Sequence, residues 1–188
     1  MHWIDPDALP ATTGHVESLI YNPHGELDGF VLDGDRLVHV PPHFAATVRK
    51  RLNAGTAVSV RGIKPRDADL VAAVAIDVDG KRFVDDGPDG HAPPEPPRTK
   101  PVDVIGSVRL TLFAPRGETC GALLQDGTIV RVHPKGNADL ADYFARGRRI
   151  EVWGPAFRKG GTLVVDVDHV AYLAESEDEA ASFADDHR

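Results

Sequence analysis

The residues best suited to bind a ligand lie close together near the end of the chain. Trp153, Phe157, Arg158 and Lys159 all fall between positions 153 and 159. Aromatic rings stack on the bases of a single-stranded nucleic acid, at about 1 to 3 kcal/mol per base, and basic side chains neutralise its phosphates. These residue types therefore indicate a nucleic-acid ligand. The alternative is that the rings have a packing role and that the cations are ordinary solvated loop charges.

The sequence shows no apparatus for catalysis or metal binding. G-x-S-x-G, phosphate-loop and dinucleotide-binding patterns are missing, and Cys120, the single cysteine, has no histidine near it in the sequence. H-E-x-x-H and paired cysteines are missing as well. Asp166 and Asp168 would share one face of a strand, but His169 would point to the other face. We therefore expect a non-enzymatic protein with no cofactor and no metal.

An internal repeat organises the chain that must position these residues. Residues 14–62 align without a gap with residues 106–154, at the constant offset of 92 that separates Gly14 from Gly106. The matched positions are mostly glycine, proline and valine, whose roles lie in backbone conformation and packing. The sequence therefore predicts one small module present twice.

Each copy is predicted to contain five strands, with a short helix between the third and the fourth. Turn residues at Asn22–Gly25 and Asp33–Asp35 separate the first three strands of copy one. The helix begins at Pro42. Its expected buried stripe is Phe44, Val48 and Leu52, followed by a glycine cap at Gly55, with Leu140, Phe144 and Gly147 as the counterparts in copy two. The predicted strands are 16–21, 30–32, 37–40, 58–61 and 70–76 in copy one, and 150–153 and 163–169 for the last two of copy two.

Composition outside the two copies sets the domain boundaries. A segment rich in proline and glycine, which cannot form the interior of a strand or helix, separates the copies and is predicted to be an extended spacer. An acidic tail follows the second copy. The predicted divisions are an N-terminal extension 1–13, module one 14–84, a linker 85–101, module two 102–174 and a tail 175–188.

The net charge of -8 resides mainly outside the modules. The tail carries six acidic residues against Arg188, and the linker carries four against Arg98 and Lys100. The two modules are therefore close to neutral, so their charge neither attracts nor excludes an anionic ligand strongly. No apolar run reaches the roughly 20 residues that span a bilayer. We expect a protein of the cytoplasm that has no membrane segment.

The order of elements and the pattern G-x-V…P-x-G-E…G-x-x-L…V-x-V-x-P…G…V-x-V-x-G resemble oligonucleotide/oligosaccharide-binding (OB) folds, in particular tandem OB-fold proteins of bacteria. The resemblance covers both copies and implies a mainly β protein with two five-stranded Greek-key barrels. Ligands of OB-folds lie over strands two and three, between the loops that follow strands one and four. Mapped onto copy two, this rule adds Arg116 and Arg131 to the four residues above. Weaker equivalents in copy one are His24, His39, Arg61, Lys64 and Arg66.

The leading functional interpretation is weak binding of single-stranded nucleic acid through the OB face of module two. Two alternatives stay open. In one, the barrels are docking or scaffold domains for other proteins; in the other, a barrel binds a small ligand or an oligosaccharide. The acidic tail would recruit a basic partner protein or would simply keep the terminus soluble.

Overall fold

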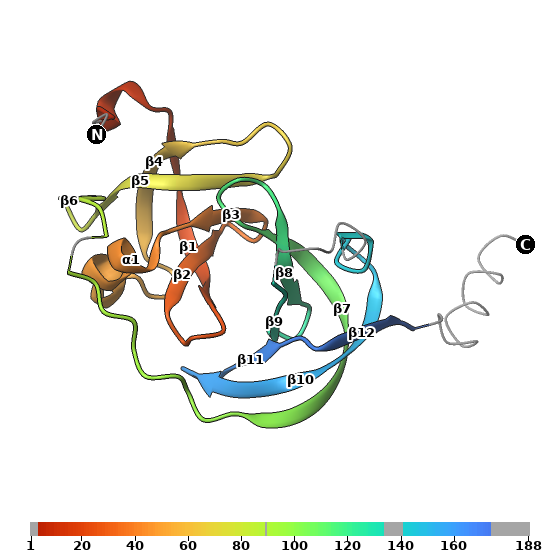
Figure 1. Cartoon of the computed structure of the whole chain (residues 1–188). Helices are drawn as coiled ribbons and strands as arrows, with labels where there is room; N and C mark the ends of the chain where they lie inside the picture. Colours follow the sequence, from red (N-terminus) through yellow and green to blue (C-terminus); the bar gives the residue numbers. More distant parts are fainter. Residues whose placement is uncertain (1–3, 89, 134–140, 174–188) are drawn as a thin grey trace, which may run out of the picture.

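A computed structural model describes residues 4–88, 90–133 and 141–173 and contains two β-barrels packed against one another (Figure 1). Barrel one follows a 3₁₀ turn at Pro6–Ala8 near the N-terminus. Its helix α1 runs from Pro42 to Val48, with a 3₁₀ turn at Arg49–Arg51. Its strands are β1 (Ala11–Tyr21), β2 (Leu27–Leu32), β3 (Arg36–His39), β4 (Ala57–Ile63), β5 (Leu70–Val78) and β6 (Lys81–Val84). The remaining strands form barrel two: β7 (Lys100–Phe113), β8 (Thr119–Leu124), β9 (Ile129–Arg131), β10 (Arg149–Lys159), β11 (Thr162–Asp166) and β12 (His169–Tyr172).

Both barrels have the strand order of an OB-fold, which confirms the predicted fold class. In barrel one the order β3-β2-β1-β4-β5 is closed by parallel pairing of β3 with β5, and β6 adds a strand beside β5. In barrel two the order β9-β8-β7-β10 is closed by β11, which pairs in parallel with β9 and antiparallel with β10. The fifth strand of barrel two continues as β12, which also pairs with β10.

Several local predictions were wrong in detail. The first strand of copy one begins earlier than expected, at Ala11, and the hairpin strand β6 was not expected. The predicted fifth strand of copy two is broken between β11 and β12. Gly55 has the expected left-handed φ of 88°, but it is not a helix cap, because the helical residues already end at Arg51. The N–H of Gly55 donates instead to the carbonyl of Val16.

The helix predicted for copy two lies partly outside the described residues, and so does Leu140. Phe144, which is described, is fully buried in barrel two and occupies the position of Leu52 in barrel one. The acidic tail 175–188 also lies outside the described residues. Among those described, no helix combines the length and the apolar character needed to cross a membrane.

Two pairs of repeated glycines allow the barrels to close. A Cβ added at Gly29 or at its equivalent Gly121 would lie 2.4 or 1.9 Å from a carbonyl oxygen of the third strand. At Gly62 and its equivalent Gly154 the corresponding distances to a carbonyl of the fifth strand are 2.3 and 2.0 Å. Gly62 lies at a register shift in the β4–β5 pairing, and Gly154 at the point where β10 changes partner from β12 to β11. Strands that bend this sharply need a residue without a side chain at the closest approach.

The two barrels share an apolar interface formed by the outer faces of their sheets. Barrel two has its own core, which includes Val108, Leu124 and Val152, but seven other buried residues of this module belong to the same apolar cluster as barrel one. They are Leu110, Leu112, Cys120, Leu123, Ile129, Phe157 and Val164. Burial of a leucine-sized side chain contributes about 1.5 to 3 kcal/mol. The barrels therefore form one packed body rather than two independent modules.

The proline-rich linker runs along barrel one before it enters β7 (Figure 1). Its beginning is fixed by a 2.6 Å contact between His43 Nε2 and Asp85 Oδ1. Further along, His91 Nε2 lies 2.7 Å from Glu26 Oε2. The described residues between β6 and β7 form neither helix nor strand.

Candidate functional site

The usual ligand face of each OB barrel is covered by the other barrel. Every residue of β2 is buried, as are five of the six residues of β8. Both faces of these strands are therefore buried, one against the core of its own barrel and the other against the opposite barrel. Phe30, Val31 and Leu32 show how this happens, because consecutive residues of a strand point to opposite faces. A strand of nucleic acid cannot lie over β2 and β3 while the barrels are packed together.

Arg131 is an internal cation rather than an exposed ligand contact. Its Nη2 donates to Asp28 Oδ2 at 2.9 Å and its Nη1 to Asp28 Oδ1 at 3.2 Å. The two side chains are 11% and 8% exposed. The expectation that Arg131 faces a ligand therefore finds no support in this geometry, because its charge is already paired across the interface with a residue of barrel one.

An approximate two-fold relation between the repeats explains which residues meet. Glu17 and Arg109, which are equivalent positions in the two copies, form an ion pair, and Arg109 also donates to the carbonyl of Gly34 at 2.8 Å. Two equivalent residues can contact one another only where they lie close to the two-fold axis that relates the copies. The loop after the first strand of each barrel consequently meets the hairpin between the fourth and fifth strands of the other. Gly25 lies beside the ring of Phe157, and Gly117 lies beside Ala68.

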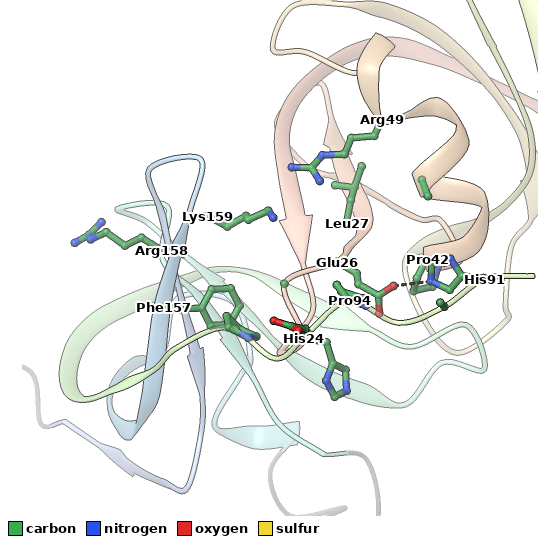
Figure 2. Close-up of a pocket in the computed structure, with 15 residues that line it drawn as sticks. His24, Glu26, Leu27, Pro42, Arg49, His91, Pro94, Phe157, Arg158 and Lys159 are labelled. Atoms are coloured by element: carbon green, nitrogen blue, oxygen red, sulfur yellow. Dashed lines mark hydrogen bonds and ion pairs between the residues drawn. The ribbon is translucent and has the colours of Figure 1, made fainter.

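One of these meeting points is a groove of about 490 Å³ between the barrels. Barrel one contributes the loop around His24 and one side of α1, the linker contributes His91 and four nearby residues, and the β10–β11 hairpin contributes the rest (Figure 2). The structure therefore brings together four of the residues singled out in the sequence: His24, Phe157, Arg158 and Lys159.

The charges of the groove come mainly from its two walls. Arg49 extends from the helix side and Lys159 from the hairpin side, and their charged ends point toward one another (Figure 2). Of the two acidic residues in the lining, Glu26 is already paired with His91, whereas Glu95 is exposed. Two cations that point into the same groove from opposite walls provide a place for an anion.

The groove has an apolar floor but offers little ring surface for stacking. Phe157 is only 8% exposed and packs against the shared apolar cluster, so it closes the groove from below. Arg158 is exposed on the hairpin and points to its outer side (Figure 2). The side chains of the groove are thus better suited to a phosphate backbone than to the faces of bases.

The other residues singled out in the sequence lie elsewhere. Arg116, Lys64 and Arg66 are exposed at the opposite meeting point of loop and hairpin. Arg61 is turned to the N-terminal segment, where its Nη1 donates to the carbonyl of Leu9 at 2.9 Å. Trp153 is partly exposed on the outer face of β10, next to Asp103 of β7.

Tyr21 and Phe113, the equivalent aromatics that end the first strands, both serve packing. Tyr21 is 5% exposed within the shared cluster, and Phe113 is packed against it. The aromatic residue at this position of both copies therefore serves packing rather than contact with a ligand.

Arg49, Glu26 and His91 are the groove residues that sequence reasoning missed. They become neighbours of the hairpin only because barrel two is docked on barrel one, and no local pattern signals that contact. One signal was available for the interface itself. The second strands contain consecutive apolar residues, Phe30-Val31-Leu32 and Ala122-Leu123-Leu124, where a strand with one solvated face would alternate with polar residues.

His39 and Cys120 lie beside the buried pair of Asp28 and Arg131. Burial lowers the pKa of His39; the attraction of Asp28 opposes this shift, and the repulsion of Arg131 adds to it. Burial also raises the pKa of the Cys120 thiol, against the attraction of Arg131. His39 and Cys120 are therefore favoured in their neutral forms, so the cysteine is a packing residue and not an activated nucleophile.

The lowered pKa of His39 predicts a loss of stability in mild acid. Above the ordinary histidine pKa of about 6.5, His39 is neutral in both folded and unfolded chains. Below that pH, His39 binds a proton more readily in the unfolded chain than in the folded protein. The free energy of unfolding therefore falls, by up to about 1.4 kcal/mol per pH unit. Urea titrations from pH 7.5 to 5 should show a shallower fall for His39→Gln than for the wild type. His24→Gln, at an exposed position, is the control; a fall that His39→Gln leaves unchanged would contradict the prediction.

Within the described ranges, no group of three or more His, Cys, Asp or Glu residues is arranged to hold a metal ion.

Comparison with known proteins gives only a distant likeness to solved structures. No protein-family model matches the chain, and no curated protein matches its sequence. Solved structures similar to it include the wild-type single-stranded DNA binding protein from Thermus aquaticus, with 15% identity and a TM-score of 0.29 over 88% of this chain and 92% of that one. A deletion mutant of the same protein gives 16% identity and a TM-score of 0.30 over 88% and 94% of the two chains. Likeness at this level identifies no ligand.

Proposed function

We propose that this is a non-enzymatic binding protein for single-stranded nucleic acid, and that the strand enters the groove between the barrels. The observation that carries the proposal is the convergence of Arg49 and Lys159 from opposite walls of that groove. A phosphate between them would accept hydrogen bonds from both side chains. His24, which is exposed at the groove, would contact a neighbouring phosphate.

The composition of the groove limits the affinity and the selectivity of this binding. The barrels are close to neutral and Phe157 is buried, so few phosphate contacts and little stacking are available. Binding is consequently weak, dependent on salt and tolerant of base sequence. A partner protein for the acidic tail and a location in the cytoplasm remain predictions from the sequence.

Charge reversal at the two converging residues tests the proposal. Arg49→Glu with Lys159→Glu should weaken binding of a fluorescein-labelled 20-nucleotide single strand at least tenfold, measured by anisotropy between 50 and 200 mM salt. Each phosphate contact to a single strand contributes a slope of about 0.7 to the logarithmic salt dependence, so the slope should fall by about 1.4.

Arg36→Glu with Arg146→Glu reverses the same number of exposed charges away from the groove and serves as the matched control. Equal loss of binding in both double variants would mean that only overall charge matters. Failure of the wild type to bind either DNA or RNA at 50 mM salt would refute the proposed function.

A further inference from the structure

The outer face of β7, β10 and β12 carries a set of exposed and partly exposed side chains, which we call the tryptophan face: Asp103, Ile105, Glu151, Trp153 and His169. Cross-strand pairing aligns Asp103, Trp153 and His169 in one row, and Ile105 with Glu151 in the next. The alternating burial of β10 shows that Glu151 and Trp153 point away from the barrel core. Ile105 is 51% exposed. An exposed isoleucine beside a tryptophan marks a surface suited to protein contact.

The equivalent face of barrel one is covered by a segment of the chain itself. Arg61 is the counterpart of Trp153 and holds the carbonyl of Leu9, and Arg82 on β6 holds Asp7 at 2.7 Å. Ala75, which pairs with Arg61 as His169 pairs with Trp153, is fully buried, whereas His169 is exposed. The short segment Asp5–Leu9 therefore docks on this face of an OB barrel through an acidic residue and a backbone carbonyl.

The charges of the two faces are opposite in sign. On barrel one, the cations Arg61 and Arg82 receive an acidic segment. On the tryptophan face the central charges are carboxylates: Asp103 and Glu151 lie side by side, and a hydrogen bond between them raises the pKa of Glu151. Arg149 lies on β10 at the margin of this face. Two adjacent carboxylates favour the approach of a cation, which relieves their mutual repulsion.

We propose that the tryptophan face binds a short extended segment of a partner protein that carries lysine or arginine beside an apolar residue. Ile105 and Trp153 would contact the apolar residue, and Asp103 and Glu151 would pair with the cation. The segment occupies on barrel two the place that Asp5–Leu9 takes on barrel one, with its charge reversed. This surface is separate from the groove, so the protein would hold nucleic acid and a partner at the same time.

A pair of matched peptides tests the proposal on the full chain. The probe is a peptide of residues 4–9 that carries Asp5→Lys and Asp7→Lys, and the control is the unaltered acidic peptide. Titration into ¹⁵N-labelled protein should shift the amide signals of residues 102–105, 151–154 and 169–171, together with the indole N–H of Trp153, only with the basic peptide. Asp103→Asn with Glu151→Gln, which keeps the shape of the face, should weaken this binding about tenfold.

Two matched measurements determine the outcome. Asp35→Asn with Glu118→Gln removes two exposed carboxylates elsewhere and should leave the binding of the peptide unchanged. Equal shifts with the acidic and the basic peptide, or no difference between the two double variants, would overturn the proposal. A single-stranded oligonucleotide that shifted the same signals would overturn it as well, since this surface would then contact nucleic acid.

Discussion

Replacement of Arg131 by methionine is expected to lower the free energy of unfolding by about 3 to 5 kcal/mol, the usual cost of leaving one buried charge without its partner. The carboxylate of Asp28, which is 8% exposed and lies between the two barrels, would then be buried without an ion-pair partner. Asp28→Leu should lower the free energy of unfolding by a similar amount, because it leaves the buried guanidinium of Arg131 without its partner. The double variant Asp28→Leu/Arg131→Met removes both charges and should recover most of the loss.

Urea unfolding, monitored by far-ultraviolet circular dichroism, measures the free energy of unfolding of the wild type, the two single variants and the double variant. Asp79→Asn is the control: it breaks the contact of 3.6 Å between Arg51 and Asp79, both well exposed, and should change stability by less than about 1 kcal/mol. The wild type should unfold in a single transition because the barrels share one apolar cluster. Two separate transitions, or a double variant as unstable as the sum of its singles, would contradict this account of the interface.

Gly154→Ala is expected to destabilise the protein by about 2 to 4 kcal/mol, through crowding alone. The new Cβ would lie 2.0 Å from the carbonyl oxygen of Asp166 and 2.9 Å from its carbon, so the backbone of β10 or β11 would have to move. Gly62→Ala should act similarly in barrel one, where the carbonyl of Ala72 is 2.3 Å away. The effect should appear as a lower urea midpoint.

Gly127→Ala separates crowding from backbone conformation. Gly127 has a φ of 91° but nothing within 4 Å of an added Cβ, so alanine there should cost only the left-handed penalty of about 1 to 2 kcal/mol. A loss at Gly154 no larger than the loss at Gly127 would show that the strands accommodate the extra atom and that close approach does not explain the repeated glycine.

The sequence by itself determined the two barrels. Their glycines, prolines and valines recur at the same spacing, and each position acts within its own copy: Gly29 beside Val38, Gly62 beside Ala72. Such contacts join segments close in sequence, so a repeated pattern predicts a repeated structure.

The tertiary structure alone decided which surfaces remain available to a ligand. Arg131 is 103 residues from Asp28 in the sequence, and the pair exists only because the two sheets face one another. Arg49 and Lys159 reach one groove for the same reason. Residue type and spacing describe a strand and its two faces, but whether a face meets solvent or another barrel depends on docking, which is set by the combined shape and apolar area of both modules.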